Sequence, residues 1–134
     1  SVADADKPAV LEVAREFTKL GFKLKATAGT HRFLQEHGIT STCIKKLGEG
    51  RPNIVDGITN KEIQLLINTP YGKRSQNDDS YMRKAAIRYR VPYITTIAAA
   101  LASAKGIAAY KEDNLRHRVR ALQEYHQGIK DHNK

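Results

Sequence analysis

Two threonines three residues apart, Thr27 and Thr30, flank a glycine in the stretch "KATAGTHRFLQEHG". The stretch is typical of a strand end, a turn and a helix start. Free backbone N–H groups and the positive end of a helix dipole meet at such a turn, so an anion is stabilised there. Gly29 lets the backbone approach a ligand closely, and both hydroxyls can donate to phosphate oxygens. The pattern indicates a phosphate site, although a simple helix cap at Thr27 or Thr30 would explain the same residues.

Further polar and charged residues follow other strand-like segments. Asn68 and Thr69 come at and after the end of the apolar run "IQLLIN", and Lys45 and Lys46 follow "TSTCI". If these strands are parallel, their carboxyl ends share the sheet edge at which α/β proteins gather ligands. A lone lysine is more often a solvated surface charge. The phosphate interpretation therefore depends on the convergence of several turns on one crevice.

The elements that must position these residues alternate between strand and helix. Helical spacing of apolar residues predicts helices at 8–20 between Pro8 and Gly21, a short one closed by Gly38, one capped by Asp78 or Asp79, one at 97–105 ended by Gly106, and a C-terminal helical segment at 111–134. Short apolar or alternating runs predict strands at 22–26, 40–44, 63–68 and 91–96. The alternation predicts an α/β fold with a parallel sheet and helices on both faces.

Length and composition narrow the classes of protein. The 134 residues, 40% hydrophobic and 28% charged, fit one globular domain. No apolar run is long enough for a membrane helix, and "SVADADKPAV" lacks the layout of a signal peptide, so no membrane contact and a cytoplasmic location are expected. The formal charge of +9 favours an anionic partner. Cys43 is the single cysteine, and we interpret it as a packed thiol.

Four segments of the chain carry a family resemblance. They are "KATAGTHRFLQEHGI", "KKLGEGRPNIVDGITN", "LLINTPYGKRSQNDDSYMRKAAIRYRVPYITT" and "LQEYHQGIK". Together they resemble the C-terminal allosteric domain of the bacterial carbamoyl phosphate synthetase large subunit, over nearly all of residues 1–134. The resemblance implies a Rossmann-like, methylglyoxal synthase-like fold with about five parallel strands in three layers. Because family members carry a strand just before "SV", one sheet position is expected to be empty or irregularly filled in this fragment.

The resemblance also implies a ligand and the residues that bind it. Family members bind nucleotide effectors, uridine monophosphate as inhibitor and inosine monophosphate as activator. The expected effector-binding residues are Ser1, Lys7, Thr27, Gly29, Thr30, Lys46, Asn68 and Thr69, with Lys73 and Arg74 close by. Pro70 stands where the family has a threonine, and proline offers neither a hydroxyl nor an N–H, so one contact is expected to differ.

For the parent enzyme, the resemblance implies catalytic domains that use ATP and Mg to make carbamoyl phosphate for pyrimidine and arginine biosynthesis. Those domains and a glutaminase small subunit are the expected protein partners. No cofactor, metal or catalytic residue is expected in this domain itself. Its mechanism would be linkage, in which a nucleotide shifts a conformational equilibrium by its differential affinity. The polar loop from Thr69 to Asp79 is the best candidate for the moving element.

One alternative is an enzyme of the same fold. Methylglyoxal synthase acts on a three-carbon phosphate and uses an aspartate in a Gly-Gly-Asp loop. The corresponding loop here is "LGEGRPN", with Arg51 in the place of the aspartate, and arginine cannot act as a base at neutral pH. Glu49 is the local substitute. The five histidines and the single cysteine form no motif for a metal or a nucleophile.

A second alternative is nucleic-acid binding by the basic segment "NLRHRVRALQEYHQGIK". Acidic residues interrupt its charge, and Leu115, Val119, Leu122 and Ile129 form an apolar stripe. A solvated helix packed on this domain explains the segment better, so no nucleic acid is expected as partner. Steep salt dependence of polynucleotide affinity would favour the alternative.

Overall fold

The computed structural model describes the backbone of residues 1–69 and 76–132, and side chains within 1–69 and 78–118. The order of elements is η1 (Asp4–Asp6), α1 (Lys7–Lys19), β1 (Lys25–Ala26), α2 (Ala28–Glu36), β2 (Thr42–Cys43), α3 (Ile54–Thr59), β3 (Leu66–Ile67), α4 (Gln76–Arg88), β4 (Tyr93–Ile94) and α5 (Ile97–His132). The alternation of strand and helix confirms the predicted α/β class.

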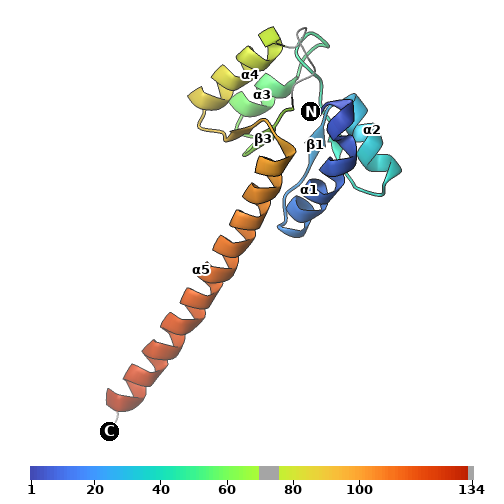
Figure 1. Cartoon of the computed structure of the whole chain (residues 1–134). Helices are drawn as coiled ribbons and strands as arrows, with labels where there is room; N and C mark the ends of the chain where they lie inside the picture. Colours follow the sequence, from blue (N-terminus) through green and yellow to red (C-terminus); the bar gives the residue numbers. More distant parts are fainter. Residues whose placement is uncertain (70–75, 133–134) are drawn as a thin grey trace.

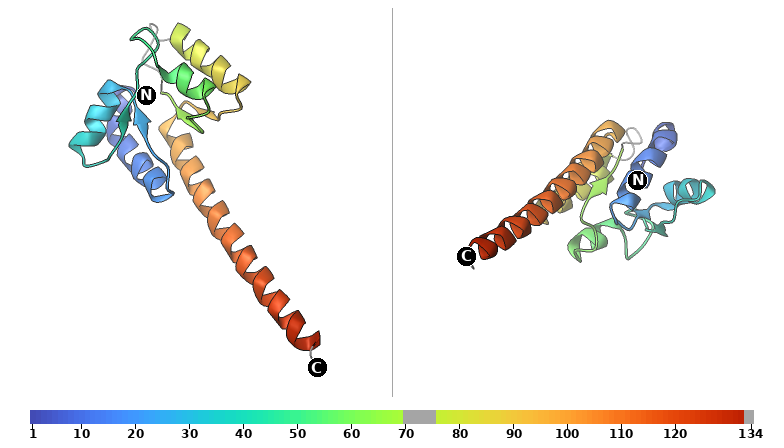
Figure 2. Two further views of the ribbon diagram at one scale, coloured as in Figure 1. Left: turned by 180° about the vertical axis from the view of Figure 1, so that it is seen from behind. Right: turned by 90° about the horizontal axis from the view of Figure 1, so that it is seen from below.

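The described strands form two separate parallel pairs. β1 pairs with β2, with Lys25 opposite Thr42, and β3 pairs with β4, with Leu66 opposite Tyr93. Four of the predicted strands are thus present, but each is shorter than its apolar run. The expected sheet of about five strands is not formed by the described residues. The N-terminus lies between the two halves of the molecule in opposite views (Figures 1 and 2).

The first half of the core is built around α1. Its apolar residues recur at helical spacing and bury one face, with Val13 and Phe17 almost fully enclosed. α2, β1 and the beginning of α5 pack against this face. The rings of Phe17 and Phe22 meet edge to face, with centroids 5.3 Å apart. Lys111 of α5 donates to the Leu20 carbonyl at 2.7 Å, so α5 also satisfies a carbonyl left open at the end of α1.

The second half of the core lies between α3, α4 and the pair β3–β4. Ile54, Ile58, Leu66 and Met82 are its buried members. α3 begins with a capping box, in which the Asn53 side chain accepts from the N–H groups of the first turn. Each half of the molecule therefore has its own cluster of buried apolar side chains, and the two clusters are distinct.

Three sequence-based expectations about elements are wrong. Gly106 does not end a helix, because α5 runs through it from Ile97 to His132. One glycine costs about 1 kcal/mol relative to alanine, which a long run of alanines and other helix formers can offset. Asp78 and Asp79 are not caps but lie in the first turn of α4, where carboxylates face the positive end of the dipole. Cys43 is exposed and not packed.

The distal part of α5 does not pack on this domain as expected. The helix extends well away from the rest of the molecule (Figure 1), and the side chains of Tyr110 and Leu115 are 71% and 63% exposed. Within the described residues, no helix is long and apolar enough to cross a membrane. The same residues contain no cluster of three or more His, Cys, Asp and Glu side chains that could hold a metal ion.

Candidate functional site

The segment from Ser1 to Ala3 joins two turns that are far apart in the sequence. The Val2 N–H donates to Thr30 Oγ1 at 3.3 Å, at the beginning of α2. The Ala3 N–H donates to Thr69 Oγ1 at 2.7 Å, just beyond β3. The turn that follows β1 and the end of β3 therefore lie close together, as expected for the carboxyl ends of parallel strands.

Thr27 is the N-cap residue of α2, but its side chain does not cap the helix. Its φ of −68° and ψ of 160° are those of an N-cap, and its side chain makes no cap hydrogen bond. Thr27 is only 1% exposed. In the described part of the chain, Thr27 Oγ1 is the one fully buried side-chain N or O atom without a hydrogen-bond partner. A hydroxyl buried without a partner costs free energy, and simple capping does not explain it here.

Lys7 brings a positive charge to the first turn of α2. A Cβ atom added at Gly29 would lie 3.3 Å from Lys7 Nζ, so the absence of a side chain at Gly29 leaves room for the ammonium. Lys7 also forms an ion pair with Asp4. The hydrogen bond from Lys7 holds the pKa of the Asp4 carboxyl below its usual value.

Lys46 adds a second cation near the N-terminal segment. Burial, and after it the charge of Lys46, lowers the pKa of the Ser1 α-amino group to about 5. The Lys46 backbone N–H donates to the Glu49 carboxylate at 2.7 Å, which ties down the loop that carries the lysine. Helix N–H groups, hydroxyls and the Lys7 ammonium thus lie near the beginning of α2, and the charge of Lys46 acts on the neighbouring Ser1, a combination that favours an anion.

Asn68 is buried at the end of β3, but its amide points to other partners. Its Nδ2 donates to Asp79 Oδ1 at 2.8 Å and to the Tyr93 hydroxyl oxygen at 2.9 Å. Both amide hydrogens are therefore used within the domain. A phosphate could receive them only if these bonds were exchanged.

The structure gathers most of the residues predicted for the site. Contacts or charge effects connect Ser1, Lys7, Gly29, Thr30, Lys46 and Thr69, and Thr27 adjoins them. Lys73, Arg74 and Pro70 lie outside the described residues. Sequence reasoning missed Asp4, Asp79 and Tyr93 as partners of site residues. Asp4 lies three residues before Lys7, a spacing that could have indicated their ion pair, whereas Asp79 and Tyr93 reach Asn68 only through folding. The role of all these residues in binding stays a prediction.

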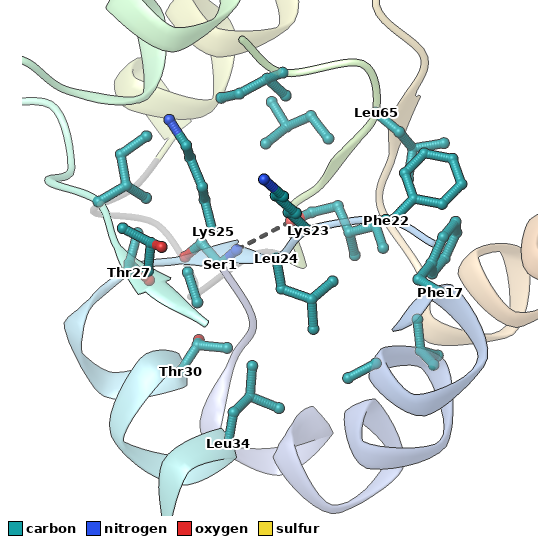
Figure 3. Close-up of a pocket in the computed structure, with 18 of the residues that line it drawn as sticks. Ser1, Phe17, Phe22, Lys23, Leu24, Lys25, Thr27, Thr30, Leu34 and Leu65 are labelled. Carbon is teal, nitrogen blue, oxygen red and sulfur yellow. Dashed lines mark hydrogen bonds between the residues drawn. The ribbon is translucent and has the colours of Figure 1, made fainter. Parts of the chain in front are cut away.

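A cavity of about 520 Å³ adjoins this site. Thr27 and Thr30 lie at one end of it, with Ser1 centrally and Phe17, Phe22 and Leu65 at the other end (Figure 3). Its walls come from β1 on one side and from the residues of and before β3 on the other. The cavity is therefore the space between the two parallel pairs.

The enzyme alternative requires a catalytic acid in the loop "LGEGRPN". In the structure, this loop instead contributes to an ion pair. Arg51 donates to Asp56 through Nη2 at 2.6 Å and through Nε at 3.3 Å. The hydrogen bond from Arg51 lowers the pKa of the Asp56 carboxyl, and the Asn53 N–H adds to the effect. The contacts of Arg51 and Asn53 thus stabilise the ionised form of Asp56.

Comparison with known proteins gives consistent matches. The family model described as "MGS-like domain" matches residues 9–95. The chain is 50% identical over 127 residues to the carbamoyl phosphate synthase large chain, C-terminal section, of Aquifex aeolicus, and 48% identical over 129 residues to that of Methanopyrus kandleri. These alignments cover 92% and 96% of this chain.

The relatives are much longer than this chain. The chain spans 24% and 23% of the Aquifex and Methanopyrus proteins, and 11% of the carbamoyl phosphate synthase large chain of Gemmatimonas aurantiaca, to which it is 47% identical over 127 residues. The resemblance found in the sequence is therefore confirmed, and it concerns one section of a larger protein.

Proposed function

The chain belongs to the MGS-like domain family, and from this premise we propose that it is the regulatory domain of a carbamoyl phosphate synthase large chain. In this proposal the site at the beginning of α2 binds the phosphate of a nucleotide effector. Uridine and inosine monophosphates are the proposed effectors, and the same large chain supplies the catalytic domains. A glutaminase small subunit, ATP with Mg in the catalytic domains, and a cytoplasmic location complete the proposed setting.

The partnerless hydroxyl of Thr27 carries the phosphate proposal. A folded protein rarely leaves a buried hydroxyl without a partner, because its lost hydration costs about 1–3 kcal/mol. A phosphate oxygen at the N-terminus of α2 would accept that hydrogen and would also meet the positive end of the helix dipole. Lys7 and Lys46 would supply charge, and Thr30 and Thr69 lie beside the position.

Regulation would follow from differential affinity. An effector that binds one arrangement of the domain more tightly than another shifts the equilibrium of the whole enzyme, typically by about 1–3 kcal/mol. The exchange of the bonds between Asn68, Asp79 and Tyr93 is one change that a phosphate could drive, because it would bring the Asn68 amide to the ligand.

Calorimetric titration of wild type and Thr27→Val tests the phosphate site. Uridine and inosine monophosphates should bind wild type more tightly than the corresponding nucleosides. Thr27→Val keeps the side-chain shape and removes a hydroxyl that has no partner, so it should weaken nucleotide binding by about 1–3 kcal/mol without lowering the melting temperature. Nucleoside binding should not change.

Thr18→Val is the matched control. It removes a hydroxyl that donates to the Ala14 carbonyl within α1, away from the site. This variant should bind nucleotides like wild type. Equal affinity of nucleotide and nucleoside for wild type, or unchanged nucleotide affinity in Thr27→Val, would contradict the proposal. Polynucleotide binding that weakens steeply with salt would instead favour the nucleic-acid alternative.

We also infer that the isolated domain is not an enzyme. The inference rests on Arg51 standing in place of the acid and on its pairing with Asp56. Glu49, the local substitute, accepts a hydrogen bond from the Lys46 N–H. An assay for methylglyoxal release from dihydroxyacetone phosphate should give background only, and turnover that Glu49→Gln abolishes would overturn the inference.

We also propose that the complete domain has a parallel sheet of about five strands. Such a sheet would need one further strand in addition to the two parallel pairs described here.

A further inference from the structure

The helix α4 packs on the domain with one face only. Met82 and Ala86 are buried on the side of α3 and β4, and α4 runs along the periphery of the molecule beside α3 (Figure 1). Because successive residues of a helix are rotated by about 100°, the residues opposite this buried line form a second face. We call it the outer face of α4, and its exposed side chains are those of Tyr81, Arg83, Lys84, Ile87 and Arg88.

The charge of the outer face has one sign. Residues 80–96 of the sequence include four cations and no acid, and three of these cations lie on the outer face. Elsewhere, cations such as Lys25 and Arg51 form ion pairs with carboxylates of the domain. Among the residues that the structure describes, no carboxylate forms an ion pair with the three cations of the outer face. Their charge is therefore available to a partner.

Aromatic rings hold the two arginines of the outer face. The guanidinium carbon of Arg83 lies 5.4 Å from the centroid of the Tyr93 ring, and that of Arg88 lies 5.7 Å from the centroid of the Tyr89 ring. The Tyr93 hydroxyl in turn accepts from the Asn68 amide at 2.9 Å, which fixes this ring. A guanidinium over a ring keeps its N–H donors at its edge, where they can form two parallel bonds to a carboxylate. Both arginines are thus ordered before a carboxylate arrives.

An exposed isoleucine lies among these charges. Ile87 is 71% exposed, and Arg83 and Lys84 precede it by one turn of the helix, so the three side chains are neighbours. A phosphate backbone gains nothing from an isoleucine, whereas protein interfaces combine an apolar anchor with arginine and aromatic residues. The exposed Asp78 in the first turn of α4 would also repel a polyanion that continued along the helix. The combination favours a polypeptide over a nucleic acid.

We propose that the outer face of α4 is a docking surface for an acidic, amphipathic helix of a partner polypeptide. Carboxylates one turn apart on the partner would meet Lys84 and Arg88, and an apolar side chain beside them would cover Ile87. The 13 residues of α4 span only about 20 Å. One helix face of this length is smaller than a stable interface needs, so the contact is transient, and the opposite charges speed its formation. The proposal does not depend on effector binding.

Designed peptides test the docking surface. The main probe is a fluorescently labelled helical peptide with a stripe of leucines flanked by glutamates. A second peptide has lysine in place of each glutamate, and a third has serine in place of each leucine. A single-stranded oligonucleotide of the same net charge as the main probe is the fourth. Fluorescence anisotropy at low salt measures the affinity of the whole chain for each of them.

Two variants separate the apolar anchor from the charge. Ile87→Ser removes the anchor at an exposed position, so the melting temperature should not fall. A triple variant removes the three cations of the outer face by Arg83→Gln, Lys84→Gln and Arg88→Gln. The matched control removes three exposed cations outside α4, by Arg32→Gln, Lys105→Gln and Arg118→Gln.

The glutamate–leucine peptide should bind wild type and the control variant equally. Ile87→Ser and the α4 triple variant should each weaken this binding by roughly tenfold. The lysine and serine peptides should bind wild type more weakly than the main probe, also by roughly tenfold.

Other results would overturn the proposal. They are no binding of the main probe at about 1 mM, unchanged affinity in Ile87→Ser, and equal losses in the two triple variants, which would indicate a general charge effect. Tighter binding of the oligonucleotide that is lost in the α4 triple variant would assign the face to nucleic acid instead. A dimer of the chain that dissociates in Ile87→Ser, detected by size exclusion, would identify a second copy as the occupant.

Discussion

The side-chain amide of Asn68 donates to the Asp79 carboxylate at 2.8 Å, and this bond connects the end of β3 to the first turn of α4. The pair places a negative charge next to a site that is otherwise rich in donors. Under the proposed function, this carboxylate would compete with a phosphate for the Asn68 amide and would repel its charge.

Asp79→Asn should therefore tighten nucleotide binding, by about 0.5–1.5 kcal/mol if one hydrogen bond to the ligand is gained. Titration calorimetry with a mononucleotide measures the effect. Asp78→Asn makes the same change at the neighbouring, exposed position and should alter affinity less. Weaker binding in Asp79→Asn would mean that the carboxylate holds Asn68 in its binding position.

Lys46→Ala should reduce nucleotide affinity by about 1–3 kcal/mol, because the ligand loses a charge-assisted contact. The melting temperature should change little. Lys45→Ala is the control, since the Lys45 ammonium occupies the space beside Gly50, 3.3 Å from where a Cβ atom would lie. Equal losses of affinity in the two variants would indicate a general charge effect and not a specific contact of Lys46.

The stability of a chain with a free Ser1 amine should depend on pH. The pKa of this amine is about 5 in the folded protein and about 8.0 as a model value. Between these values the unfolded state binds a proton that the folded state does not, so the free energy of unfolding should rise from pH 5 to pH 8. Full protonation of this amine at low pH would lower the free energy of unfolding by up to about 4 kcal/mol, at about 1.36 kcal/mol per unit of pKa difference.

An N-acetylated form isolates this contribution, because it lacks the amine and keeps every other titratable group. Chemical denaturation of both forms at several pH values gives the difference. A difference that is constant from pH 5 to pH 8 would show that the amine is solvated in the folded state.

Gly106→Ala should stabilise the domain by up to about 1 kcal/mol, because Gly106 lies inside α5 with no neighbouring atom within 4 Å of an added Cβ. Gly57→Ala should destabilise it, since the added Cβ would lie 2.7 Å from Ile63 Cδ1. Thermal denaturation of both variants measures the contrast. Destabilisation by Gly106→Ala would mean that the helix is interrupted at that residue.

Local patterns in the sequence predicted the helix–strand alternation and the meeting of Thr27, Thr30 and Thr69 at one edge. Both follow from periodicity and from the geometry of parallel strand ends. The partners of these residues were not predictable in the same way. The bond from Ala3 to Thr69 and the bond from Asn68 to Asp79 join distant segments, and no local pattern encodes them.

The errors in the sequence analysis have similar physical causes. Gly106 predicts a helix end, whereas the helix formers on both sides of it propagate α5 through this residue. The apolar runs predict strands of five or six residues, whereas only two residues are paired in each of β1, β2, β3 and β4. The length of a strand depends on the partners along its edges, which an apolar run does not encode.

The long helix α5 gives the domain a mechanical property. Its 36 residues correspond to a rod of about 54 Å at about 1.5 Å per residue. The rod begins three residues after β4, which is paired to β3 and so to the end that carries Asn68 and Thr69. Pivoting of this rod about its base by about 5° would carry the far end through about 5 Å, from the rise per residue alone. Were the base of α5 to pivot in this way, the helix would act as a lever arm, and a small rotation beside the sheet would move its far end by about one helical turn.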